Sequence, residues 1–256
     1  MDRHLKLVIF AHARSGSSSL CKILQHHRAL KIAEEPFHHR YSVWNPTEKN
    51  YVDHVTDITS LEDQLRELFT TYNGIKILQC QLPPDIYTHL LLKPDVRVVF
   101  LRRRNLLQAA VSGAIAEQTK VWKVWDLKSD VANAYANLKQ LSIHRLRETI
   151  KYVHENMRMY EQVVDRRAGS SFVKIWYEDL YTSNVETNRR SIMPVFDMLG
   201  LSISASKAID RLLDPKITKL NSSITYGYVP HVDEIDAELG NDETGWLFED
   251  HESITR

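Results

Sequence analysis

Short apolar runs alternate along this chain with segments of helical periodicity, and this alternation limits the fold more than any other feature. The runs are rich in β-branched residues and lie at 5–11 (LKLVIFA), 74–79 (GIKILQ), 96–101 (VRVVFL) and 172–176 (FVKIW). Runs of this kind are typical of strands buried on both faces of a parallel sheet. Helical patterns occupy 17–27, 58–72, 105–118 and 130–167, the last holding one long helix or two. The chain is therefore predicted to form an α/β fold with crossover helices.

Length and composition favour one compact domain over residues 1–256. Hydrophobic residues make up 43% of the chain, which is enough to form a core. No apolar run approaches the roughly 20 residues that span a bilayer, so no membrane span is expected. Residues 1–10 lack the apolar stretch and cleavage site of a signal peptide, and the only cysteines, Cys21 and Cys80, do not suggest a disulfide framework. These features predict a cytoplasmic protein.

The charge of the chain is balanced overall but unevenly distributed. Lys and Arg number 33, as do Asp and Glu, but segment 232–256 holds nine acidic residues and one Arg, so it carries −8 and the rest carries +8. A basic body suits a small polyanionic ligand, whereas a nucleic-acid-binding protein more often has a continuous basic stripe. No nucleic-acid partner is therefore expected. The acidic segment is either a functional element or simply a solvated end of the chain.

The strongest local signal is the sequence Ala-Arg-Ser-Gly-Ser-Ser-Ser-Leu at 13–20, between the first predicted strand and the first predicted helix. A glycine permits a tight turn, and the N–H groups of a helix N-terminus attract an anion. Serine hydroxyls and an arginine add further donors. This pattern predicts a phosphate-binding loop, although an ordinary Ser-rich loop with a good helix cap remains the alternative. The candidate ligands are Arg14, Ser15, Gly16, Ser17, Ser18 and Ser19.

A second basic feature follows the strand at 96–101, where Arg102, Arg103 and Arg104 precede a predicted helix. Ser112 lies eight residues after Arg104, and the two side chains can converge on one phosphate if the turn folds back over the helix. A solvated basic edge is the simpler alternative. The loop at 13–20 lacks the lysine of a Walker A motif, and no strand ends in the aspartate that would hold magnesium.

These two features, in this order, resemble the sulfotransferases that use 3′-phosphoadenosine 5′-phosphosulfate (PAPS). The sequence Tyr-Glu-Asp-Leu at 177–180, after the last predicted strand, is similar to a motif of the same family. The resemblance covers roughly residues 5–200 and is nearest to the bacterial trehalose-type and carbohydrate sulfotransferases. It implies a three-layer, P-loop-like fold with a central parallel sheet of about five strands. It also implies PAPS as donor, its desulfated product PAP, and a small-molecule acceptor.

The resemblance implies roles for individual residues. Arg14 and the loop would hold the 5′-phosphosulfate and stabilise the departing phosphate, and Arg104 and Ser112 would hold the 3′-phosphate. The sequence Glu-Pro-Phe at 35–37 is similar to the segment that carries a catalytic glutamate, so Glu35 is the candidate general base. Its neighbours Glu34, His38 and His39 remain alternatives for that role.

Three functions remain open: a PAPS-dependent sulfotransferase, a metal-dependent small-molecule kinase, and a nucleotide-binding relative that has lost its chemistry. The histidine pairs and the cysteines lack the spacing of zinc ligands, so no metal site is predicted. Whether the protein is a homodimer is left open. Lys219 is either a donor contact or an exposed loop lysine. Aromatic side chains that either line an acceptor pocket or belong to the core are Tyr41, Trp44, Trp122 and Trp125.

Overall fold

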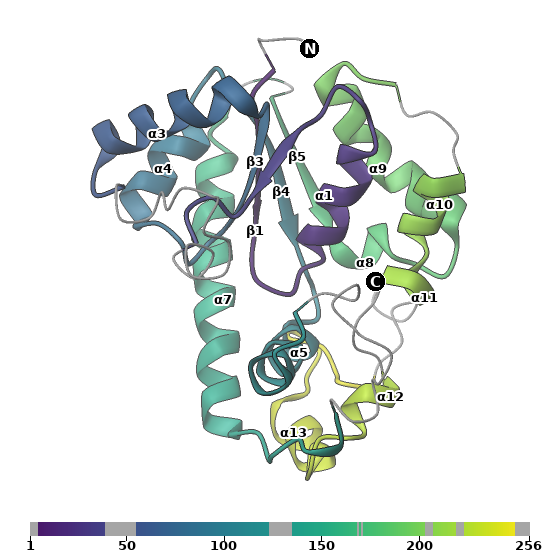
Figure 1. Ribbon diagram of the computed structural model, residues 1–256. Helices are drawn as coiled ribbons and strands as arrows, with labels where there is room; N and C mark the ends of the chain where they lie inside the picture. Colours follow the sequence, from purple (N-terminus) through teal and green to yellow (C-terminus); the bar gives the residue numbers. More distant parts are fainter. Residues whose placement is uncertain are drawn as a thin grey trace.

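The structure is a computed structural model that describes residues 5–38, 55–122, 135–167, 169, 171–202, 207–218 and 223–248. Its centre is a five-stranded parallel sheet with the strand order β2-β3-β1-β4-β5 (Figure 1). The strands are β1 (Leu7–Ala11), β2 (Ile32–Glu34), β3 (Gly74–Leu78), β4 (Arg97–Arg102) and β5 (Phe172–Trp176). The predicted α/β fold and parallel sheet are confirmed.

Helices cover both faces of the sheet, and the alternation of side chains along β1 shows why. Leu7, Ile9 and Ala11 belong to a core cluster with α1 (Ser17–Gln25), α9 (Val185–Leu199) and α10 (Lys207–Leu213). Val8 and Phe10 point to the other face. There they join a cluster with α3 (Ile58–Thr71), α4 (Pro84–Leu92) and α7 (Ile143–Val164). The molecule is therefore a three-layer structure (Figure 1).

A third cluster lies beyond the carboxyl ends of the strands (Figure 1). It joins α5 (Leu106–Thr119) and the first half of α7 to residues of α12 (Ser223–Tyr226) and α13 (Val232–Leu239). Val232, Ile235 and Leu239 of α13 are buried in it. The acidic segment is thus folded over 232–248, with its apolar side chains buried and most of its acidic side chains exposed. Residues 249–256 lie outside the described residues.

Some element boundaries differ from the sequence pattern for identifiable reasons. The long helix begins at 143 because Ser142 caps it, its hydroxyl accepting from the Arg145 N–H at 3.3 Å. Helix α4 begins at Pro84. Proline suits the first position of a helix, because an N–H group there has no acceptor within the helix and its absence costs no hydrogen bond. Strand β2 has three residues, too few to give an alternating pattern. None of the described helices is long and apolar enough to cross a membrane.

Candidate functional site

The loop between β1 and α1 forms a tight turn at the carboxyl edge of the sheet. Gly16, the N-cap of α1, has a φ of 81° in the left-handed region. The Ser15 hydroxyl donates to the carbonyl of His12 at 2.7 Å and closes the turn. A glycine N-cap has no side chain to occupy the first N–H groups of α1, and the helix dipole is positive there. This geometry fits an anion at residues 16–19.

Arg14 reaches from this loop to α5. Its Nε donates to the Ser112 hydroxyl at 3.0 Å, and its guanidinium also donates to the carbonyl of Trp122 at 2.5 Å. Burial, together with the nearby Arg103, lowers the pKa of Arg14. Arg14 also has a left-handed φ of 64°, a strained conformation that tends to occur at functional sites. Two residues predicted for different phosphates, Arg14 and Ser112, are therefore in contact.

His12 fixes the base of the loop, a role that the sequence did not indicate. Its Nδ1–H donates to the carbonyl of Ala13 at 2.9 Å, and its Nε2 accepts from the backbone N–H of Arg103 at 3.1 Å. Burial, opposed by the bond to Ala13 and assisted by two nearby arginines, lowers the pKa of His12 to about 3. The neutral ring thus joins the end of β1 to the end of β4.

The arginines after β4 point in different directions. The Arg104 guanidinium donates to both carboxylate oxygens of Asp179, at 2.7 and 2.9 Å, and lies over the ring of Trp176. Arg103 is 5% exposed and donates to the carbonyl of Arg14 at 3.1 Å and to the side-chain oxygen of Gln108 at 2.6 Å. It is therefore Arg103 that contacts the loop. That Arg104 and Ser112 converge on one phosphate stays a prediction.

The Tyr-Glu-Asp-Leu motif forms the short helix α8 (Tyr177–Leu180) and links the two basic features. The ring of Tyr177 packs against Gly16, where an added Cβ would lie 2.7 Å from its Cδ2. The fully buried Glu178 carboxylate accepts from the N–H groups of Arg104 and Asn105 at 3.0 and 3.1 Å. Asp179 pairs with Arg104. Each of the first three motif residues therefore contacts either the loop at 13–20 or the arginines at the end of β4.

Glu35 lies just past the end of β2 and is 8% exposed. Its φ of 54° is in the left-handed region, and its N–H donates to the carbonyl of Lys76 at 2.7 Å. The carboxylate accepts at Oε1 from Lys76 Nζ and at Oε2 from Gln81 Nε2, the latter at 3.0 Å. Lys76 Nζ also lies 3.3 Å from the Ser18 hydroxyl. The predicted base is thus one side chain away from the loop, through a lysine that the sequence analysis missed.

Sequence comparison finds no matching protein family and no matching curated protein. In structure, the chain matches a sulfotransferase domain from the curacin biosynthetic pathway with a TM-score of 0.50 at 14% identity, over 92% of this chain and 97% of that one. The chain has the sulfotransferase fold.

Two further matches have lower TM-scores. Mouse sulfotransferase SULT7A1 complexed with PAP gives 0.47 at 12% identity, over 86% of this chain and 68% of that one. A sulfotransferase domain from the Synechococcus PCC 7002 olefin synthase gives 0.41 at 14% identity, over 89% and 85% of the two chains. None of the three is described as a trehalose-type enzyme, so closeness to that group stays a prediction.

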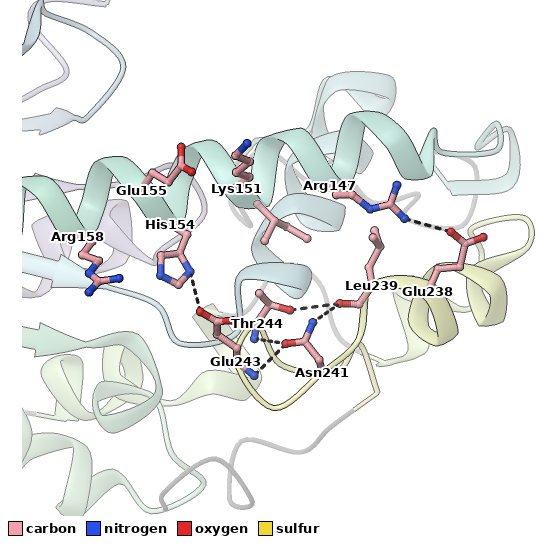
Figure 2. A pocket seen from close by; sticks show the side chains of 11 residues that line it. Arg147, Lys151, His154, Glu155, Arg158, Glu238, Leu239, Asn241, Glu243 and Thr244 are labelled. Atoms are coloured by element: carbon pink, nitrogen blue, oxygen red, sulfur yellow. Dashed lines mark hydrogen bonds and ion pairs between the residues drawn. The ribbon is translucent and has the colours of Figure 1, made fainter.

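Within this sulfotransferase fold, a cavity of about 450 Å³ lies apart from the loop, between α7 and segment 238–244 (Figure 2). Its basic side chains come from α7 and its acidic ones mostly from the C-terminal segment. An ion pair crosses it from Arg147 to Glu238 at 3.2 Å, and His154 Nδ1 lies 3.7 Å from Glu243 Oε1. No predicted site residue lines it. The cavity therefore does not enlarge the candidate site.

Other predicted residues have less structural support. Trp122 is 38% exposed beside Arg14, a position compatible with an acceptor wall. Glu34 lies 3.6 Å from Lys76, and the His38 N–H donates to the carbonyl of Glu35 at 3.0 Å. The remaining candidates lie outside the described residues: His39, Tyr41, Trp44, Trp125 and Lys219.

Proposed function

We propose that the protein is a PAPS-dependent sulfotransferase that transfers a sulfuryl group to a hydroxyl or amine of a small molecule, such as a secondary metabolite or glycoside. The observation that carries this proposal is the contact of Arg14 with Ser112 beside the open start of α1. It brings together two sequence features that the resemblance assigns to opposite ends of one bisphosphate nucleotide. The sulfotransferase fold supports the same assignment.

The loop also has properties that fit an anionic ligand. Within the part of the chain that the structure describes, two buried side-chain polar atoms have no hydrogen-bond partner: Gln79 Oε1 and Arg103 Nε. Both residues flank the loop, because the Gln79 N–H donates to the carbonyl of Ala11 at 3.0 Å and Arg103 donates to the carbonyl of Arg14. Polar atoms of this kind are rare in folded proteins and are usually satisfied by a ligand or by water. Of the two, only the Nε–H of Arg103, 3.9 Å from the Glu178 carboxylate, can donate to an anion, because the Gln79 oxygen is an acceptor.

The reaction follows from the charges in this arrangement. The acceptor oxygen or nitrogen forms a bond to sulfur while the bond between sulfur and the 5′-phosphate oxygen breaks. The N–H groups at the start of α1 and the Arg14 guanidinium stabilise the negative charge that develops on the leaving phosphate. Glu35 accepts the proton of the acceptor, since a carboxylate oxygen that already accepts one hydrogen bond has a second lone pair.

A kinase is disfavoured for two reasons. Gly16 is followed by Ser17, whereas a Walker A motif has a lysine after its second glycine, and β4 is followed by arginines instead of the aspartate that would hold magnesium. Calorimetric titration with PAP, in parallel with ATP and magnesium, separates the two functions without knowledge of the acceptor. We expect PAP to bind without metal. Removal of charge-assisted contacts in Arg14→Ala should weaken binding by about 10- to 100-fold.

The matched control is Arg66→Ala, which removes an exposed arginine from α3, away from the loop. It should leave PAP affinity unchanged. Binding of ATP with magnesium but not PAP would establish the kinase instead. PAP binding together with failure of PAPS to transfer its sulfuryl group to any member of an acceptor panel would favour the non-catalytic relative. In an active enzyme, Glu35→Gln should lower kcat by about 10²- to 10⁴-fold with little change in PAP affinity.

A further inference from the structure

Lys76 is a charged residue at a position where the strand pattern requires an apolar one. It is the third residue of β3 and is 0% exposed, and its register partners are Ile9 of β1 and Glu34 of β2. The other residues of β3 are glycine, isoleucine and leucine. An ammonium group buried in such a strand is unfavourable unless anionic and hydrogen-bonding partners surround it.

Its partners come from both sides of the proposed site. Nζ donates to Glu35 Oε1 and lies 3.3 Å from the Ser18 hydroxyl in the first turn of α1. A weaker ion pair joins it to Glu34 at 3.6 Å. The ammonium therefore connects the donor loop to the predicted base.

Lys76 remains a cation at any pH at which the enzyme would act. Burial by itself would lower the pKa of Lys76, but the neighbouring carboxylates, chiefly Glu35, outweigh it and raise the pKa to about 12. Two cysteines also face the pair, buried Cys21 from α1 and Cys80 after β3. Burial and the charge of Glu35 raise the pKa of the Cys80 thiol, so this thiol does not supply a competing anion.

We propose that Lys76 is a positioning residue for sulfuryl transfer, which fixes the Glu35 carboxylate relative to Ser18 in the donor loop. This inference rests on the proposed function. Lys76 is too deeply buried to touch an acceptor, so it acts through Glu35. A general base has to lie within hydrogen-bond reach of the acceptor proton, and a buried cation on one carboxylate oxygen fixes the position of the other.

The test uses Lys76→Gln, which keeps a hydrogen-bond donor but removes the charge, and Lys76→Met, which removes both. We expect PAP affinity in calorimetry to stay within about threefold of the wild type while kcat falls by about tenfold or more. The KM for the acceptor should change less than kcat, because Lys76 positions the base and does not touch the acceptor. Unchanged kcat would show that Lys76 only fills the core.

The matched control is Lys174→Gln. Lys174 is also a strand lysine paired with two carboxylates, Glu161 at 3.2 Å and Asp165 at 2.6 Å, but these lie on and just after α7. Its kcat and its KM for the acceptor should match the wild type. If the neutral variants do not fold, Lys76→Arg retains the charge with a different shape. It should lower kcat with little change in PAP affinity, and a kcat equal to that of the wild type would overturn the proposal. Failure of the wild type to bind PAP would refute the proposed function instead.

Discussion

Replacement of Gly16 by alanine tests whether the donor loop is held as tightly as the geometry indicates. Alanine in the left-handed conformation at a φ of 81° costs about 1–2 kcal/mol. The added Cβ would also lie 2.7 Å from Tyr177 Cδ2 and 3.1 Å from Tyr181 Cε2. Such overlap in a packed region costs about 1–3 kcal/mol more. The expected loss in the free energy of unfolding for Gly16→Ala is therefore about 2–5 kcal/mol.

The rings have little room to move away. Tyr177 is 7% exposed and Tyr181 is 2% exposed, and their ring centroids are 5.0 Å apart. The guanidinium of Arg103 lies over the ring of Tyr177, 4.5 Å from its centroid. A shift of Tyr177 would therefore disturb the arginine that contacts the loop. We accordingly expect Gly16→Ala to weaken PAP binding by about tenfold or more.

Gly200→Ala is the matched control. Gly200 ends α9 with a similar φ of 67°, but an added Cβ would meet no atom within 4 Å. This variant should lose only the backbone part, about 1–2 kcal/mol, and should bind PAP normally. Urea unfolding of both variants gives the difference between them, which we expect to be about 1–3 kcal/mol. Equal losses in the two variants would refute the argument that Tyr177 and Tyr181 rigidly enclose the loop.

The other contacts of the site give three further expectations. The unfolded state binds a proton at His12 near its ordinary pKa of 6.5, whereas the folded state binds it at about 3, so unfolding free energy should fall by up to about 1.4 kcal/mol per unit as pH drops between these values. Thermal unfolding of His12→Gln should lack that component. Asp179→Asn frees Arg104 from a half-exposed ion pair, so PAP should bind up to about fivefold more tightly in calorimetry if Arg104 is a phosphate ligand, and no gain would exclude that role. Glu178→Gln should lower the urea unfolding free energy by about 1–3 kcal/mol, since two N–H groups lose a charged acceptor; a loss within error would exclude a capping role.

Local sequence patterns were sufficient to predict four strands of the sheet and the turn between β1 and α1. Those four strands lie in mainly apolar runs, and the turn at Gly16 lies where a strand pattern gives way to a helical one. Strand β2 could not be found in this way, because three residues carry no period. Its position depends on pairing with β3, which is a tertiary interaction.

The three arginines at the end of β4 show the limit of choosing a ligand by its spacing from another residue. Counting eight residues back from Ser112 selects Arg104. Arg102 ends β4 and Arg104 lies two residues past it, and both guanidinium groups lie over Trp176, at 4.6 and 4.7 Å. Arg103 points the other way, toward the loop. The sequence does not show which arginine turns to the loop, because Arg103 and Arg104 lie outside the strand.

Lys76 was also visible in the sequence, as the one charge inside the run at 74–79. A buried lysine needs an anionic partner, so the residue type alone predicts a carboxylate nearby. Which carboxylate could not be predicted, because Glu35 is 41 residues away and reaches Lys76 only through the pairing of β2 with β3.

The starts of α1 and α5, both at the carboxyl edge of the sheet, differ in a way that only the structure shows. At α5 the donors are already used: Glu178 accepts from the N–H groups before the helix, and the carbonyl of Thr244 accepts from the Leu107 N–H at 3.1 Å. The Asn105 side chain accepts from the Gln108 N–H. At α1 the N-cap is a glycine and makes no side-chain bond. An anion at the start of α1 can therefore be bound by backbone N–H groups, whereas one near α5 has to be bound by side chains such as Ser112.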